Sequence, residues 1–223
     1  MKRKKENTKT NSIPITFHSL AQLVTKYKAL TISLAVLLVL GAAAPALWTW
    51  YGNEKRQDFA QKTFSFRKRP LEDFKKGELK VETFLEQAQE IAKRFKGNAL
   101  LGPFLLDVAH ELLQKEHFQE TADLLSEYAQ GLGGSPYLKT LLGFQLASAY
   151  EDLGRYDRAL STLKALLPLK LSEDKIYFDL GRYHQLKGDT IKAKQSFDYV
   201  MEKHPDSEFA KLAKVYAHER PRP

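Results

Sequence analysis

Apolar residues follow one pattern near the N-terminus of this chain and another over the remainder. The stretch from Ala29 to Trp50 carries no charged side chain. A helix of that length spans roughly 33 Å, which matches the hydrocarbon core of a bilayer. Beyond about residue 79, apolar residues recur three and four apart, as on one face of a helix. The two patterns predict an all-α chain with one N-terminal transmembrane helix at residues 29–51 and amphipathic helices after it.

The amphipathic segments repeat along the chain. Four residues, Leu146, Gly154, Ala159 and Leu163, are followed 34 residues later by Leu180, Gly188, Ala193 and Phe197. This spacing resembles that of tetratricopeptide repeats, in which a small residue lies where two helices cross and glycine lies in the turn between them. We therefore expect a tetratricopeptide-like helical-hairpin solenoid with its clearest repeats at about 140–171 and 174–205 and a capping helix at 206–219.

Weaker copies of the repeat precede these two. Ala109 aligns with Ala147 once a short insertion is allowed in the Gly-rich joint at 131–136, and Glu116 takes the place of the turn glycine. An amphipathic helix near residues 81–95 is expected to be the second helix of a degenerate first pair, whose first helix continues from the apolar segment through Phe59. The expected divisions are a basic cytoplasmic leader at 1–28, the transmembrane helix at 29–51, a basic juxtamembrane linker or helix at 52–78, and the repeat domain at 79–223.

Basic residues flank both ends of the predicted transmembrane helix. Residues 1–28 carry seven basic side chains and one acidic, and residues 52–76 carry eight and four. The positive-inside rule counts charges near the helix ends, so these flanks do not decide the orientation. A cleaved signal peptide is the alternative to a membrane anchor, although the apolar run is longer than an ordinary signal core. We expect lipid headgroups to be contacted by aromatic and basic residues beyond the helix, namely Trp48, Trp50, Arg67, Lys68 and Arg69.

The net charge of the chain, +8, comes from these flanks. Residues 77–223 carry 20 basic and 22 acidic side chains. A folded nucleic-acid-binding domain would carry its basic stripe on the domain itself, so no nucleic-acid partner is expected.

No motif in the chain predicts catalysis. There is no cysteine, which excludes disulfides, thiolate metal sites and cysteine nucleophiles. His110 and Glu111 lack the second histidine of a zinc protease motif, and the glycines at residues 131–134 lack the lysine of a phosphate loop. We expect no enzyme, no catalytic or metal-ligating residue and no cofactor.

Function in a helical-hairpin solenoid resides on the groove formed by the first helix of each pair. Phe144 and Phe178 lie one repeat apart and are expected to form an aromatic ladder in that groove. Ordinary packing of both rings is the alternative. The repeat alignment places seven side chains on the groove: His110, Phe144, Ser148, Glu151, Phe178, Arg182 and Gln185.

The order of the segments resembles the YfgM-like family of bacterial inner-membrane proteins. The stretches LWTWYGNEKRQDFAQ and FLEQAQEIAKRFKGNALLGPFLLDVAHELLQKEHFQETADLL carry the resemblance, which covers most of the chain from about Lys26. It implies a single-pass inner-membrane protein with its N-terminus in the cytoplasm and its repeats in the periplasm. It also implies an ancillary subunit of the SecYEG translocon that links exported chains to a membrane-anchored periplasmic chaperone.

Two other functions are compatible with the repeats. Repeats that face the cytosol would be a scaffold for envelope or secretion-system assembly. Repeats whose edges pair between copies would form a homo-oligomer. In all three cases the chain is expected to be a membrane-anchored protein–protein interaction module.

Overall fold

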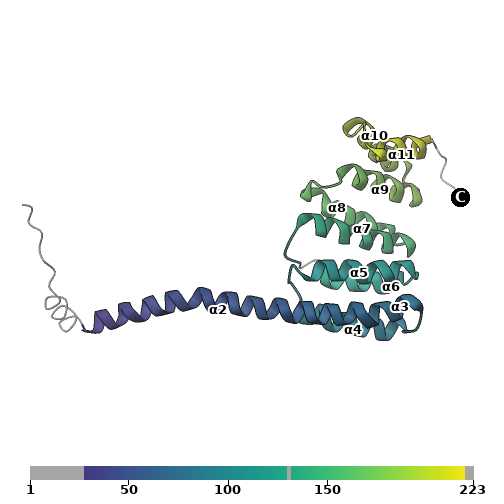
Figure 1. Cartoon of the computed structure of the whole chain (residues 1–223). Helices are drawn as coiled ribbons and strands as arrows, with labels where there is room; N and C mark the ends of the chain where they lie inside the picture. The colour runs from purple at the N-terminus through teal and green to yellow at the C-terminus, as the bar shows by residue number, and fades with distance from the viewer. Residues whose placement is uncertain (1–27, 130–131, 219–223) are drawn as a thin grey trace, which may run out of the picture. The chain divides into compact units, whose positions relative to one another are not determined.

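All the secondary structure in the described residues of the computed structural model is helical. The structure describes residues 28–129 and 132–218, without the side chains of residues 28–31, 34, 35, 44–51 and 218. Its elements, drawn in Figure 1, are α2 (Lys28–Phe66), the π-helix η1 (Arg67–Leu71), α3 (Glu72–Lys76), α4 (Val81–Arg94), α5 (Leu101–Gln114), α6 (Phe118–Tyr128), α7 (Pro136–Asp152), α8 (Tyr156–Leu166), the short 3₁₀-helix η2 (Leu167–Leu169), α9 (Glu173–Leu186), α10 (Thr190–Lys203) and α11 (Glu208–His218).

The chain forms two compact units, Met1–Arg56 and Gln57–Pro223. The described part of the first unit is the N-terminal portion of α2. Among the described residues, no helix is both long enough and apolar enough to cross a membrane. The transmembrane helix expected at 29–51 is therefore not confirmed, and several of its side chains lie outside the described residues.

The second unit is a stack of helix pairs (Figure 1). The C-terminal part of α2 continues through η1 and α3, and its Phe66 and Asp58 contact Phe84 and Arg94 of α4. Along the rest of the chain α5 packs with α6, α7 with α8, and α9 with α10. Helix α11 packs against α9 and α10 as the expected capping helix. The predicted all-helical, hairpin solenoid is confirmed in the described residues.

Turns between paired helices place one residue in the left-handed region. Gly154 and Gly188 have φ of 66° and 84° at the turns that follow α7 and α9. Glu116 lies at the equivalent turn after α5 and has φ of 62°. The turn is thus retained where glycine is absent, although a residue with a Cβ adopts this conformation at a cost in free energy.

Much of the segment expected at 52–78 as a juxtamembrane linker or helix is helical, and its second half packs in the first helix pair. Phe66, Leu71 and Phe74 are buried, and the Phe74 ring stacks on that of Phe84 in α4 with centroids 4.0 Å apart. These residues belong to the second unit, which begins at Gln57, so its core extends upstream of residue 79. As expected for the degenerate first pair, its first helix runs through Phe59, since α2 is continuous from Lys28 to Phe66.

Candidate functional site: a groove along the first helices

The first helices of consecutive pairs line a groove in the second unit. Its volume is about 730 Å³. Side chains come to it from η1 and α3 of the first pair and from α5, α7 and α9 of the later ones. The lining residues are Arg67, Leu71, Glu72, Lys75, Leu106, Asp107, His110, Glu111, Leu141, Phe144, Gln145 and Lys175.

The apolar part of the groove consists of Leu106, Leu141 and Phe144. All three are partly buried, and Leu106 and Phe144 pack against the core of the second unit. Leu106 and Phe144 occupy equivalent positions of α5 and α7, and Leu141 lies one turn before Phe144. The repeat therefore places apolar side chains side by side on successive helices.

Two ion pairs join the first helix pair to α5 at this groove. Arg67 of η1 lies 2.7 Å from Asp107, Nη2 to Oδ2, and its Nε donates a hydrogen bond to the same oxygen. Lys75 of α3 lies 3.6 Å from the Glu111 carboxylate and 3.3 Å from that of Glu72. A hydrogen bond to Glu72, with help from Glu111, raises the pKa of Lys75. The ammonium group is thus held charged by carboxylates on both sides.

Lys175 closes the α9 end of the groove. Its ammonium nitrogen lies 2.6 Å from Asp179 Oδ2 and 4.6 Å from the centre of the Phe144 ring. It also lies 5.5 Å from the Phe209 ring of α11. A cation over an aromatic face is attracted by the ring quadrupole, so Lys175 connects α7, α9 and α11 at one point.

Arg182 and Glu151, two of the predicted groove residues, bind each other. Arg182 Nη1 and Nη2 donate to the two carboxylate oxygens of Glu151 at 2.9 and 2.8 Å. Arg182 Nε also donates to Asp179 at 3.4 Å. Burial works against the charge of Arg182, but the Glu151 and Asp179 carboxylates outweigh it and raise the pKa of the guanidinium. Burial and the same two carboxylates raise the pKa of the neighbouring Tyr183 hydroxyl.

Gln145 is a polar residue of the groove with one unsatisfied atom. Its Nε2 donates to the Leu106 carbonyl oxygen at 3.5 Å, which is long for a hydrogen bond. Its Oε1 is buried and receives no hydrogen bond from any described residue.

The predicted aromatic ladder is wrong at one of its two rings. Phe178 is 5% exposed, because α11 covers it with Phe209 and Tyr216 at centroid distances of 5.6 and 5.3 Å. Phe144 is partly exposed and lines the groove. The capping helix occupies the space that a further first helix would fill, so the ring at the third equivalent position becomes core.

The other predicted groove residues are distributed over α5, α7 and α9. His110 is exposed and lines the groove. Ser148 is partly buried one turn beyond Phe144. Gln185 Nε2 reaches the Tyr216 carbonyl oxygen at 3.5 Å and so connects α9 to the cap.

The residues expected at lipid headgroups lie in different parts of the chain. The side chains of Trp48 and Trp50 lie outside the described residues. Arg67 lines the groove and pairs with Asp107, and its contact with lipid headgroups stays a prediction. Lys68 and Arg69 are exposed on η1.

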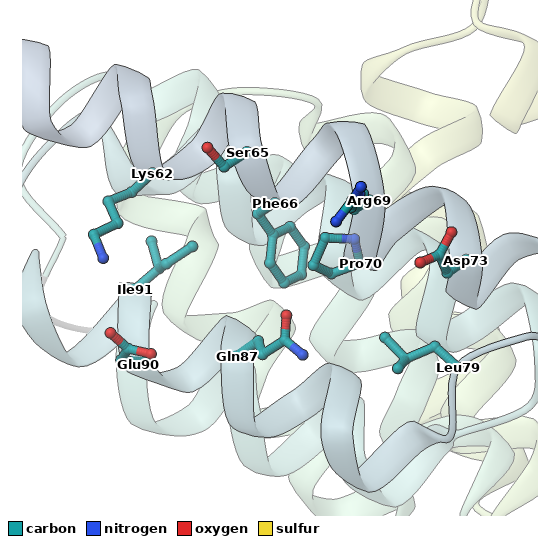
Figure 2. Close-up of a pocket in the computed structure, with 10 residues that line it drawn as sticks. All are labelled: Lys62, Ser65, Phe66, Arg69, Pro70, Asp73, Leu79, Gln87, Glu90 and Ile91. Atoms are coloured by element: carbon teal, nitrogen blue, oxygen red, sulfur yellow. The ribbon is translucent and has the colours of Figure 1, made fainter.

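Arg69 lines a second, smaller cleft of about 400 Å³ between the end of α2 and α4. Figure 2 shows Phe66 and Pro70 side by side above Gln87 of α4, with Lys62 extending toward Ile91. Pro70 lies inside η1, where its missing N–H accounts for the local widening of the helix. The cleft mixes basic and acidic side chains, so it has no single electrostatic character.

Within the described ranges, no group of three His, Asp or Glu side chains lies close enough to hold a metal ion. The absence of catalytic residues stays a prediction.

The Tetratricopeptide repeat-like domain family matches residues 23–196 of the sequence. The chain belongs to this family. Tetratricopeptide arrays present extended surfaces to other proteins, so the domain is a protein–protein interaction module. No curated protein matches the chain significantly. Among solved structures it is similar to one described as "MamA RS-1 ArsTM double mutant", with 14% sequence identity over 71% of this chain and 86% of that chain and a TM-score of 0.49.

Several groove residues of this tetratricopeptide domain were missed in the sequence. The repeat register contains a signal for two of them, since Leu141 lies 34 residues before Lys175. Asp107 and Gln145 likewise occupy equivalent positions of α5 and α7. Lys75 and Glu111 carry no such signal, because their pairing depends on how the first two layers stack.

Proposed function

We propose that this chain is a membrane-anchored interaction module whose groove binds an extended segment of a partner protein. In its finer form, the proposal is an ancillary subunit of the SecYEG translocon, with the N-terminus in the cytoplasm and the repeats in the periplasm. There it would pass exported chains to a membrane-anchored periplasmic chaperone.

The groove is the observation that carries this proposal. It runs across first helices of successive repeats, exposes part of Leu106, Leu141 and Phe144, and is open to solvent at His110. Family membership supports protein partners in general. The translocon and the chaperone come from the resemblance of the sequence to the YfgM-like family.

The described N-terminal part of α2 supports an anchor. Ile32 and the run Val36–Leu40 are each more than half exposed. Consecutive apolar side chains around a whole helix are stable in hydrocarbon and costly in water.

Photocrosslinking in living cells tests groove binding. A photoreactive phenylalanine analogue at Leu141 in the groove is expected to crosslink to partner proteins, which mass spectrometry identifies. The matched control is the same analogue at Ser161, which is exposed on α8, the second helix of that pair. Equal crosslinking from both positions, or none from Leu141, would contradict groove binding. Translocon subunits and a chaperone among the products would support the finer proposal.

A single cysteine tests the topology. Asp206 is exposed between α10 and α11, and the chain has no cysteine of its own. The variant Asp206→Cys is expected to react with a membrane-impermeant thiol reagent on intact spheroplasts. Reaction only after lysis would place the repeats in the cytosol and favour the scaffold for envelope or secretion-system assembly.

A further inference from the structure

The charged side chains of the groove are already matched to one another. Three of the lining residues are basic and three are acidic. Each basic side chain has a carboxylate within 4 Å, and the pairs are Arg67–Asp107, Lys75–Glu72, Lys75–Glu111 and Lys175–Asp179. A charged ligand that approaches one member of such a pair is repelled by the other. The groove therefore offers a charged segment little attraction beyond what it offers a neutral one.

The uncharged surface of the groove is suited to apolar side chains. Leu106, Leu141 and Phe144 are only partly buried, and a hollow of about 730 Å³ lies over them. Volumes of about 300–1,000 Å³ are typical of pockets that enclose a small ligand, which corresponds to a few side chains of an extended segment. An apolar ligand that covers these three side chains shields them from water, which favours its binding.

Gln145 offers a hydrogen-bond acceptor for the backbone of a bound segment. Its Oε1 receives no hydrogen bond from the described residues, and its Nε2 is held only by the long bond to the Leu106 carbonyl. Turning the amide toward the groove breaks this one weak bond and lets Oε1 accept a hydrogen bond from a bound chain. An extended segment has backbone N–H groups available for that purpose.

We infer that the groove binds an extended, uncharged segment with apolar side chains, which donates a backbone hydrogen bond to Gln145. The inference rests on the groove function proposed above and adds the chemical class of the partner. An acidic or a basic docking peptide is the competing class, and the test distinguishes the two.

Three matched peptides test the charge class. Each is an end-blocked nonapeptide with a neutral dye, built from Leu, Phe and either Asn, Asp or Lys. Binding to the full chain in phospholipid nanodiscs is measured by fluorescence anisotropy, with empty nanodiscs as the blank. The Asn peptide is expected to bind at least about fivefold more tightly than the other two, with less than about a twofold change between about 50 and about 500 mM salt. Tighter binding of the Asp or Lys peptide, or failure of all three to bind, would overturn the inference.

Two glutamine variants test the role of Gln145. Gln145→Leu keeps the size of the side chain and removes the acceptor, and it is expected to weaken binding of the Asn peptide about five- to tenfold. Gln119→Leu is the control, since the Gln119 amide bonds to Asp123 within α6 and does not line the groove. Thermal unfolding by circular dichroism verifies that both variants are folded. Equal affinity of Gln145→Leu and the parent chain would show that Gln145 is not the acceptor.

The peptide assay and the cellular crosslink test the two proposals separately, so either proposal can be refuted without the other. Crosslinking at Leu141 together with preference for a charged peptide would refute the inference and leave the interaction module standing. Binding of the Asn peptide at the groove without a cellular crosslink would refute the proposed function in cells while the chemical class is supported.

Discussion

The guanidinium group of Arg182 and the carboxylate of Glu151 form two parallel hydrogen bonds, which join α9 to α7 across two repeats. The side chains are 25% and 21% exposed. Arg182 also contacts Asp179, whose side chain is 7% exposed. Arg182 thus neutralises the almost wholly buried carboxylate of Asp179. Its pair with Glu151 connects neighbouring layers of the solenoid.

Replacing Arg182 is expected to destabilise the fold. Arg182→Met keeps the aliphatic stem of the side chain but leaves Asp179 with Lys175 alone and Glu151 with no guanidinium. Breaking a largely buried pair in this way costs about 3 kcal/mol. Urea unfolding of the full chain measures the change.

The control for this variant is Lys194→Met. Lys194 pairs with Asp198 on α10, but the side chains are 73% and 37% exposed. Loss of an exposed pair changes stability by less than about 1 kcal/mol. Similar effects of the two substitutions on the free energy of unfolding would show that burial of the Arg182 pair does not add to its effect on stability.

Local requirements of the repeat made much of the fold predictable. The small residue at each crossing and the glycine at each turn recur at 34 residues, and they identified the pairs α7–α8 and α9–α10. The first pair was harder to recognise, because its first helix has no start of its own and its composition is basic. The sequence does not indicate that Phe66 and Phe74 are core residues, because they are buried by the packing of α4 against them.

The groove was predictable only in part, for a related reason. The register identifies which side of a first helix faces the groove, and so it found Phe144. It does not identify which neighbouring element covers that side. Phe178 shares the register of Phe144 but lies under α11, and Arg67 came from a basic run yet pairs with Asp107 of α5.

The two phenylalanines at equivalent positions are expected to differ in what their removal changes. Phe178→Ala leaves a cavity between α9, α10 and α11 and is expected to cost about 3–5 kcal/mol in the free energy of unfolding. Phe144→Ala removes a partly exposed ring, so it is expected to cost less and to reduce photocrosslinking from Leu141. Unfolding and crosslinking are measured on the same preparations. A Phe144→Ala chain that crosslinks as well as the parent would contradict a groove contact at this ring.

Stability of the last repeat is expected to depend on pH through His184. Burial lowers the pKa of this histidine from 6.5. The charged groups that act on it are Asp189, which opposes the shift, and Lys164, Lys192 and Lys187, which add to it. Because the unfolded chain takes up the proton first, stability is full above about pH 6.5 and falls as the pH is lowered further. Urea unfolding between about pH 7 and about pH 5 is expected to show a smaller loss in His184→Gln.

A matched histidine makes that comparison specific. His110 is exposed on α5, so His110→Gln is expected to retain the loss of stability on acidification. An equal pH dependence in the parent chain and His184→Gln would assign the effect to other groups.

Glycine is expected to stabilise the turn after α5. Glu116 has φ of 62°, and Glu116→Gly relieves that conformation, with an expected gain of about 1 kcal/mol. Gly154→Ala is the reverse test at the equivalent turn. A Cβ there would meet no atom within 4 Å, so its cost reports the backbone alone. Thermal unfolding of both variants is expected to give shifts of opposite sign, and a destabilised Glu116→Gly would contradict the argument.

The contact between Gly181 and Phe197 is expected to limit how large the residue at the helix crossing can be. A Cβ on Gly181 would clash with the Phe197 ring, and that residue is 1% exposed, so the ring has little room to move. Gly181→Ala is therefore expected to cost about 1–3 kcal/mol, although alanine favours the helix. The double variant Gly181→Ala with Phe197→Leu tests the cause, since removing the ring removes the clash. A double-mutant cycle from urea unfolding should give a lower cost for Gly181→Ala when Phe197 is leucine, and strict additivity would show that the two residues do not constrain each other.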